Sequence, residues 1–225
     1  MIPNRLHIAR FALLVCALPL LLRATAAEAQ INFALSVGDG MFAEGLQDLD
    51  FTQKNGGIVR HGDTVTVALS SDDEPYLGVI EVIAAKGYEI DVDILFDTEL
   101  RPPAERFDQL QTLPVEYFWS YNNKNPDSCD AHAVAHATEV PAGFSTARFE
   151  SLPFEGTTPG LPPAPMHGGI NGGESFGSGD DEVTFRREAV RVCLFFGGFL
   201  DTVPIIPNDT YSAEIVVNIR YSEPL

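Results

Sequence analysis

Two histidines four residues apart, His132 and His136, lie close to Cys129 and are the first candidates for metal chemistry. On a helix, this spacing places both imidazoles on one face, as in many zinc sites. The surrounding residues show no helical pattern, and on a strand the two rings would lie roughly 13 Å apart, too far to share an ion. We therefore predict no metal ion and no cofactor at this point of the chain.

Carboxylates offer two further candidates. Asp91 and Asp93 are separated by one residue, and paired carboxylates perform acid–base chemistry in glycosidases. They alternate with Ile90 and Val92, so we interpret them as the solvent face of an amphipathic strand. The run Asp180-Asp181-Glu182 has oxygen ligands for calcium, but no EF-hand or calcium repeat surrounds it.

Composition and motifs exclude several classes of function. Asp and Glu number 32 against 14 Lys and Arg, which gives a formal net charge of −18. Such a surface repels phosphate backbones, so we expect no nucleic-acid partner. The sequence also lacks the serine-nucleophile, Walker and dinucleotide-binding motifs, so we predict a protein without catalysis.

The first 29 residues are typical of a secretory signal peptide. Arg5 and Arg10 precede a short apolar run, 11–22, and Ala27-Glu28-Ala29 fits the A-x-A cleavage pattern. The apolar run is too short for a spanning helix, which needs about 20 apolar residues. We expect cleavage after Ala29, a mature protein without a membrane span, and a location in the periplasm, at the cell surface or outside the cell.

Two cysteines remain after that cleavage, Cys129 and Cys193. In the oxidising compartment that export implies, an even pair favours one disulfide. Two buried free thiols are the alternative. We expect the disulfide, which closes a long loop and stabilises the fold by about 4 kcal/mol in the chain-entropy model.

Apolar residues recur with period two along most of the mature chain, which predicts strands. The segment 77–83 has few polar residues, which predicts a strand buried on both faces, and the Gly-containing turn after it predicts a hairpin. The segment 104–113 is a candidate short helix, and Gly197-Gly198 is a candidate bend or bulge. The predicted strands span 31–37, 65–69, 77–83, 88–94, 115–121, 189–196 and 211–221.

Many short strands separated by turns predict an all-β fold, a β-sandwich. We expect residues 30–225 to form a single domain. The stretch 155–181 is dense in Gly and Pro and has little apolar surface to offset the entropy of ordering. We therefore expect a long flexible loop insertion there.

Three segments together resemble the pilin-like secreted domains of Gram-negative bacteria. They are the alternating strand 31–37 after the signal peptide, Asp48-Leu49-Asp50-Phe51 with the later Thr64-Val65-Thr66-Val67, and Asn208-Asp209-Thr210-Tyr211-Ser212 opening the last strand. The group that the chain resembles is the archaic chaperone–usher pilus subunits, with their spore coat protein U domain. Related uncharacterised bacterial secreted proteins share the pattern.

The resemblance implies an immunoglobulin-like sandwich. In those pilus subunits one strand is missing, and a neighbouring molecule supplies it by β-augmentation. Four alternating apolar side chains have the spacing that such a donor or edge strand needs: Ile31, Phe33, Leu35 and Val37. The alternative is that they form the first strand of their own sandwich.

We therefore predict a secreted or surface structural protein, a pilin-like subunit. Its partners would be identical or related subunits and a periplasmic chaperone. The alternative function is a carbohydrate- or ligand-binding sandwich that uses the aromatic residues of one predicted strand, which otherwise belong to the core. These aromatics are Tyr117, Phe118, Trp119 and Tyr121.

Overall fold

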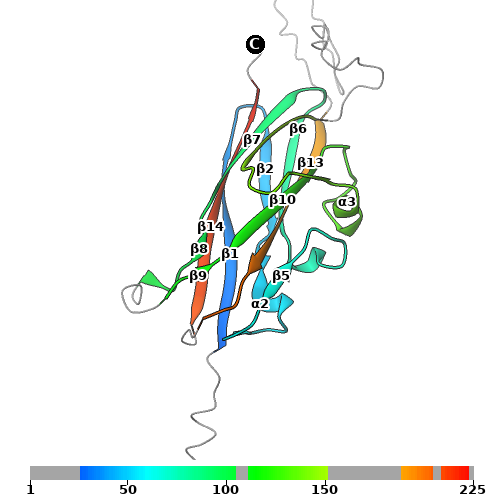
Figure 1. Ribbon diagram of the computed structural model, residues 1–225. Helices are drawn as coiled ribbons and strands as arrows, with labels where there is room; N and C mark the ends of the chain where they lie inside the picture. Colours follow the sequence, from blue (N-terminus) through cyan, green and yellow to red (C-terminus); the bar gives the residue numbers. More distant parts are fainter. Residues whose placement is uncertain (1–25, 105–110, 152–188, 205–208, 223–225) are drawn as a thin grey trace, which may run out of the picture.

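A computed structural model describes residues 26–104, 111–151, 189–204 and 209–222 of the protein (Figure 1). In this part of the chain two six-stranded sheets pack against each other, and a small two-stranded sheet lies beside them. The prediction of an all-β sandwich is confirmed. The predicted loop at 155–181 and the acidic run at 180–182 lie outside the described residues. None of the helices in the described part is long and apolar enough to cross a membrane.

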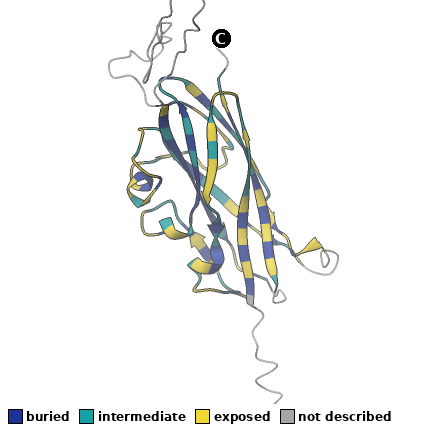
Figure 2. Ribbon diagram, turned by 180° about the vertical axis from the view of Figure 1, so that it is seen from behind, coloured by how far each residue is buried: buried dark blue, intermediate teal, exposed yellow. Residues whose placement is uncertain are grey.

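The first sheet contains both the first and the last described strand. Its order is β12–β7–β14–β1–β3, and β4 pairs with one end of β1. Burial alternates along β14, so one face of this sheet packs into the core while the other meets solvent (Figure 2). The strands are β1 (Ala26–Val37), β3 (Leu49–Asp50), β4 (Val59–Arg60), β7 (Glu89–Phe96), β12 (Thr146–Glu150) and β14 (Thr210–Tyr221).

The second sheet has the order β11–β10–β13–β6–β2, and β5 pairs with β13. Its central strand β13 is buried on both faces from Val192 to Gly198, and the segment with helix α3 (Ala131–Ala135) lies over the outer side. The prediction of burial on both faces for 77–83 is confirmed only in part, because Glu81 and Ile83 of β6 are half-buried. The strands are β2 (Phe42–Gln47), β5 (Val65–Val67), β6 (Gly78–Ala85), β10 (Glu116–Asn122), β11 (Thr138–Glu139) and β13 (Ala189–Leu200). The small sheet pairs β8 (Glu99–Leu100) with β9 (Leu113–Pro114).

The predicted hairpin between β6 and β7 is wrong. β6 pairs with β13 and β2, whereas β7 pairs with β14 and β12 in the other sheet. The chain crosses between the sheets at Gly87, whose φ of 72° suits a residue without a side chain and whose N–H donates to the Ser151 carbonyl at 2.7 Å. Period-two patterning identifies the buried face of each strand, but it does not say whether two successive strands share a sheet or face each other across the core.

The glycine pair in β13 forms no bulge, because β13 pairs with β10 without a register shift at both glycines and continues to Leu200. The two glycines make room for aromatic rings instead. A Cβ at Gly197 would overlap the ring of Phe118, and a Cβ at Gly198 would lie 2.7 Å from the ring of Phe51. The missing side chains therefore serve packing rather than backbone conformation.

Three short helical elements lie wholly within the described residues. α2 (Phe51–Lys54) begins after Asp50, whose carboxylate accepts a hydrogen bond from the Gln53 N–H at 2.9 Å and so caps the helix. α3 follows Asp130 in the same way, in a segment where the sequence predicts no helix. The third is the 3₁₀ helix η1 (Glu74–Tyr76). Residues 105–110 of the predicted helix 104–113 lie outside the described residues.

Candidate functional site

The first strand of the chain lies beside the last one. β1 and β14 run parallel and keep one register over ten residue pairs, from Glu28 opposite Thr210 to Val37 opposite Ile219. β3 and β4 pair only with the first part of β1, so among the described strands residues 32–37 have a partner on one side only. β1 is thus a long strand that is held mainly by the C-terminal strand.

The four residues that the sequence singles out as a donor or edge strand all belong to β1. Ile31 is fully buried, whereas the other three are half-buried: Phe33, Leu35 and Val37. In this conformation they form the first strand of the chain's own sandwich, which is the alternative that the sequence leaves open. The incomplete burial of three of them leaves part of this apolar face in contact with solvent.

Among these four side chains, Phe33 has the most specific packing contacts. Its ring lies over Gly78 of β6, where a Cβ would overlap the ring edge, and it packs against Phe196 with ring centroids 4.9 Å apart. Gly78 and Phe196 are themselves cross-strand partners in the second sheet. The ring of Phe33 therefore bridges the two sheets and enters a space that exists only because residue 78 has no side chain.

Backbone and hydroxyl contacts fix the start of β1. The Thr52 hydroxyl accepts a hydrogen bond from the Ala29 N–H at 2.5 Å and lies 3.3 Å from the Ala29 carbonyl. The Glu28 N–H donates to the Asp209 carbonyl at 3.0 Å. Ala27 and Ala29 are 1% and 0% exposed, so residues that the expected cleavage would remove fill part of the core. The sequence gives no signal for the role of Thr52, because its hydroxyl acts across 23 positions of the chain.

The far end of β1 is held by Tyr221. The Gly38 N–H donates to the Ile219 carbonyl at 2.8 Å, which extends the pairing with β14. The Tyr221 hydroxyl lies 3.3 Å from the Gly40 carbonyl and accepts a hydrogen bond from the Ala85 N–H at 2.7 Å. One phenol thus connects the turn after β1 with the end of β6.

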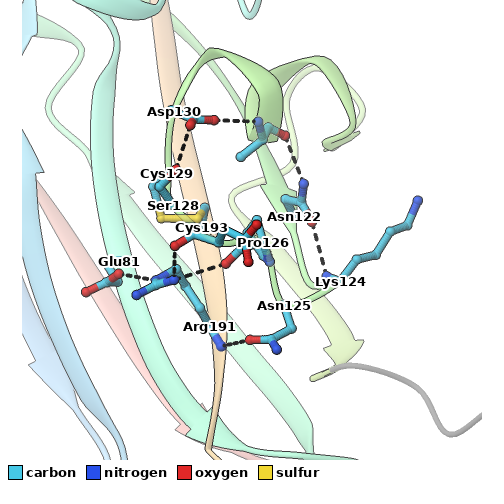
Figure 3. The surroundings of a disulfide bond; sticks show 12 residues. Glu81, Asn122, Lys124, Asn125, Pro126, Ser128, Cys129, Asp130, Arg191 and Cys193 are labelled. Atoms are coloured by element: carbon cyan, nitrogen blue, oxygen red, sulfur yellow. Dashed lines mark hydrogen bonds and ion pairs between the residues drawn. A yellow bond between two sulfur atoms is a disulfide. The ribbon is translucent and has the colours of Figure 1, made fainter.

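A disulfide and an arginine anchor the segment that covers the second sheet. Cys129 and Cys193 form the predicted bond, with their Cα atoms 5.5 Å apart. Arg191, two residues before Cys193, pairs with Glu81 and donates to the backbone carbonyl of Asp127 (Figure 3). The sequence predicts the disulfide. It does not predict the anchoring role of Arg191, because the residues that Arg191 contacts lie far from it along the chain.

His132 lies in α3 and His136 is the C-cap residue directly after it, and both side chains are exposed. The ring centroids of His132 and His136 are 4.4 Å apart, and the His136 Nδ1 lies 2.9 Å from the His132 carbonyl oxygen. Cys129 is engaged in the disulfide, so it is no third ligand. No group of three or more His, Cys, Asp or Glu able to hold a metal ion occurs among the described residues.

Asp91 and Asp93 lie on the outer face of β7, as the sequence predicts. The Arg148 guanidinium donates to both carboxylate oxygens of Asp91, at 2.6 and 3.1 Å. This hydrogen bonding lowers the pKa of Asp91 below its usual value. A carboxylate that is held ionised by an arginine is a poor general acid.

The aromatic residues of β10 lie mostly inside the sandwich. Trp119 is 2% exposed and stacks on Phe196, and its indole N–H donates to the Phe144 carbonyl at 2.9 Å. Tyr121 stacks on Phe149, with ring centroids 4.0 Å apart. Burial raises the pKa of Tyr117, whose hydroxyl donates to the Asp97 carbonyl at 2.7 Å. Trp119 thus belongs to the core, whereas Tyr117, Phe118 and Tyr121 are half-buried, and the ring of Phe118 lies over Gly197.

Neither a protein-family model nor a curated protein matches this chain. Its function must therefore be inferred from physical features of the fold. The most distinctive feature is β1, which pairs with β14 from Glu28 to Val37, has a strand partner on one side only from residue 32 to 37 among the described strands, and inserts Phe33 into the space above Gly78.

Proposed function

We propose that this chain is an exported structural or interaction protein without catalysis, a pilin-like subunit in which β1 pairs with β14 of another copy. The observation that carries the proposal is the parallel pairing of β1 with β14 along ten residues. An immunoglobulin-like topology and a location outside the cytoplasm are parts of the same proposal. Its partners are identical or related subunits, and a chaperone that covers the apolar strand before assembly.

The physical basis is that exchange of β1 conserves its contacts. When β1 of one copy replaces β1 of another, the same backbone hydrogen bonds and the same Phe33 contacts form between molecules instead of within one. The free-energy cost of the exchange is therefore confined to opening the turn at 38–41 and to the entropy that two molecules lose when they associate. Three of the four inward apolar side chains of β1 are only half-buried, so less apolar contact is lost when β1 detaches from its own sandwich.

The alternative function, a carbohydrate- or ligand-binding module, has less support. It requires accessible aromatic rings, and Trp119 is almost fully buried while Tyr121 is stacked on Phe149. We therefore give preference to the strand-exchange proposal.

A crosslinking experiment tests strand exchange directly. Ser36 and Asn218 are opposite each other on β1 and β14, at a strand spacing of about 4.8 Å that suits a disulfide. One preparation carries Ser36→Cys and a second carries Asn218→Cys, and the two are mixed, incubated and mildly oxidised. We expect a disulfide-linked heterodimer, because β1 of the first protein pairs with β14 of the second.

The matched control replaces the second preparation with Ser212→Cys, which lies on the same strand but six positions out of register. Strand exchange gives a large excess of the Ser36–Asn218 heterodimer over this control. Equal yields of the two heterodimers, together with a persistent monomer in native electrophoresis, would contradict the proposal.

A further inference from the structure

We infer that His132 and His136 form an open binding site for a divalent transition-metal cation such as Zn²⁺ or Cu²⁺, with water in the remaining coordination positions. The two imidazoles are exposed, and their ring centroids lie 4.4 Å apart on one side of α3. Imidazole is the side chain that zinc, copper and nickel prefer among nitrogen ligands. This site is independent of the exchange of β1.

The turn that carries the two histidines is rigid, which favours binding. The Asp130 carboxylate accepts hydrogen bonds from the N–H groups of His132 and Ala133 at 3.0 and 3.1 Å. The Asn122 side chain donates to the Ala133 carbonyl at 2.9 Å, and Cys129 ties the segment to β13 through the disulfide. Because the backbone is already ordered, a bound cation restricts little more than the two rings.

One ring is held in the form that binds metals. The His136 Nδ1 lies 2.9 Å from the His132 carbonyl oxygen, so in the neutral ring Nδ1 carries the proton and donates it. The lone pair is then on Nε2, which points away from this hydrogen bond. A backbone carbonyl that orients an imidazole in this way is the usual second contact of metal-binding histidines.

The electrostatic surroundings attract cations. The whole chain has a formal net charge of −18, which raises the local concentration of cations near its surface. The nearest carboxylate in sequence, Asp130, is occupied by its hydrogen bonds to Ser128, His132 and Ala133, so it is not available as a direct ligand. The protein therefore supplies two nitrogen ligands.

Isothermal titration with zinc chloride, on untagged protein with its disulfide intact, tests this inference. The matched control is His61, another exposed imidazole whose Nδ1 lies 3.0 Å from a carbonyl oxygen, that of Val203. We expect His132→Ala and His136→Ala each to weaken the tightest zinc binding at least tenfold, and His61→Ala to change it less than twofold.

Imidazole NMR signals of the unmodified protein give a second readout that does not depend on the folding of variants. We expect the signals of His132 and His136 to shift together at the first equivalent of zinc while those of His61 stay in place. The inference is overturned if the His132 and His136 signals stay in place, or if zinc binds the double variant His132→Ala/His136→Ala within twofold of the unmodified protein.

Discussion

The ring of Phe33 occupies the position that a side chain at residue 78 would need. Phe33 lies on the first strand of one sheet, and Gly78 lies at the start of β6 in the other sheet. The contact therefore links the strand proposed to exchange with the sheet that stays behind. It adds to the pairing with β14 in holding β1 in place.

We expect Gly78→Ala to lower the free energy of unfolding by about 1–3 kcal/mol, the usual cost of overpacking a filled site. The added methyl group overlaps the Phe33 ring, so the ring must move away from its position over residue 78. Urea denaturation measures the change. In the double variant Phe33→Ala/Gly78→Ala the methyl group has room. The double variant should therefore lose less unfolding free energy than the two single variants lose together.

Gly45→Ala is the matched control, because a Cβ at this position of β2 meets no atom within 4 Å. We expect it to leave the free energy of unfolding nearly unchanged. Gly78→Ala could prove equally neutral, or the changes in unfolding free energy at Phe33 and Gly78 could prove strictly additive. Either result would show that the Phe33 ring does not pack over residue 78.

The Arg191 cluster is expected to hold the segment before α3 in place. Arg191→Gln removes the ion pair with Glu81 and the hydrogen bond to the Asp127 carbonyl, and hydrogen bonds to charged groups contribute about 1.5–3 kcal/mol each at most. We expect faster amide hydrogen exchange at residues 123–130 and a lower free energy of unfolding. The control is Arg60→Gln, at an exposed position of β4. Unchanged exchange in 123–130 would show that the side chain of Arg191 does not hold this segment.

The strands at the chain's C-terminal end were predictable because their patterning is strong and local. Buried positions alternate with exposed or half-buried ones along β14 from Tyr211 to Ile219, and the side chains of this segment alternate in polarity in the same way. β13 and the disulfide at Cys193 follow from the same local signals. β2 was missed because it is an edge strand with a register shift between Gly45 and Gln47, which leaves Phe42 and Leu46 exposed.

Features that depend on distant residues could not be predicted in the same way. α3 is only five residues long and is stabilised by the Asp130 cap, the disulfide and Asn122, so its own residues show little helical period. This short helix brings His132 and His136 together, although the sequence indicates no helix there. Likewise, the packing of Phe33 over Gly78 depends on how the two sheets stack. Period-two patterning does not determine this stacking.

The ion pair between Asp91 and Arg148 is expected to make part of the stability depend on pH. Because Arg148 lowers the pKa of Asp91 below the ordinary value of 3.8, the unfolded chain binds more protons than the native state in acid. The stabilisation is therefore complete above 3.8 and is lost as the pH falls through the lower pKa of the folded protein. We expect the unfolding free energies of the unmodified protein and Asp91→Asn to converge in acid.

Urea denaturation from neutral pH into the acid range measures this convergence. In a background of Arg148→Gln, Asp91→Asn should have a much smaller and nearly pH-independent effect. A constant difference between the unmodified protein and Asp91→Asn at every pH would show that the ion pair does not shift the protonation of Asp91.

The proposed export of the protein leads to a prediction about its mature N-terminus. Cleavage after Ala29 would remove two fully buried side chains, Ala27 and Ala29, and the hydrogen bond from the Glu28 N–H to the Asp209 carbonyl. A second A-x-A pattern, Ala24-Thr25-Ala26, lies three residues earlier, and a cut after it retains all of these contacts. We therefore expect the mature chain to begin at Ala27.

Intact mass measurement of protein recovered from the periplasm or the culture medium distinguishes the two cuts. As a direct comparison, recombinant chains beginning at Ala27 and at Gln30 can be unfolded in urea. The shorter chain should be less stable, because it lacks the part of β1 that pairs with β4 and fills the end of the core. Recovery of a chain that begins at Gln30, with the same stability as the longer one, would show that β1 needs none of residues 27–29.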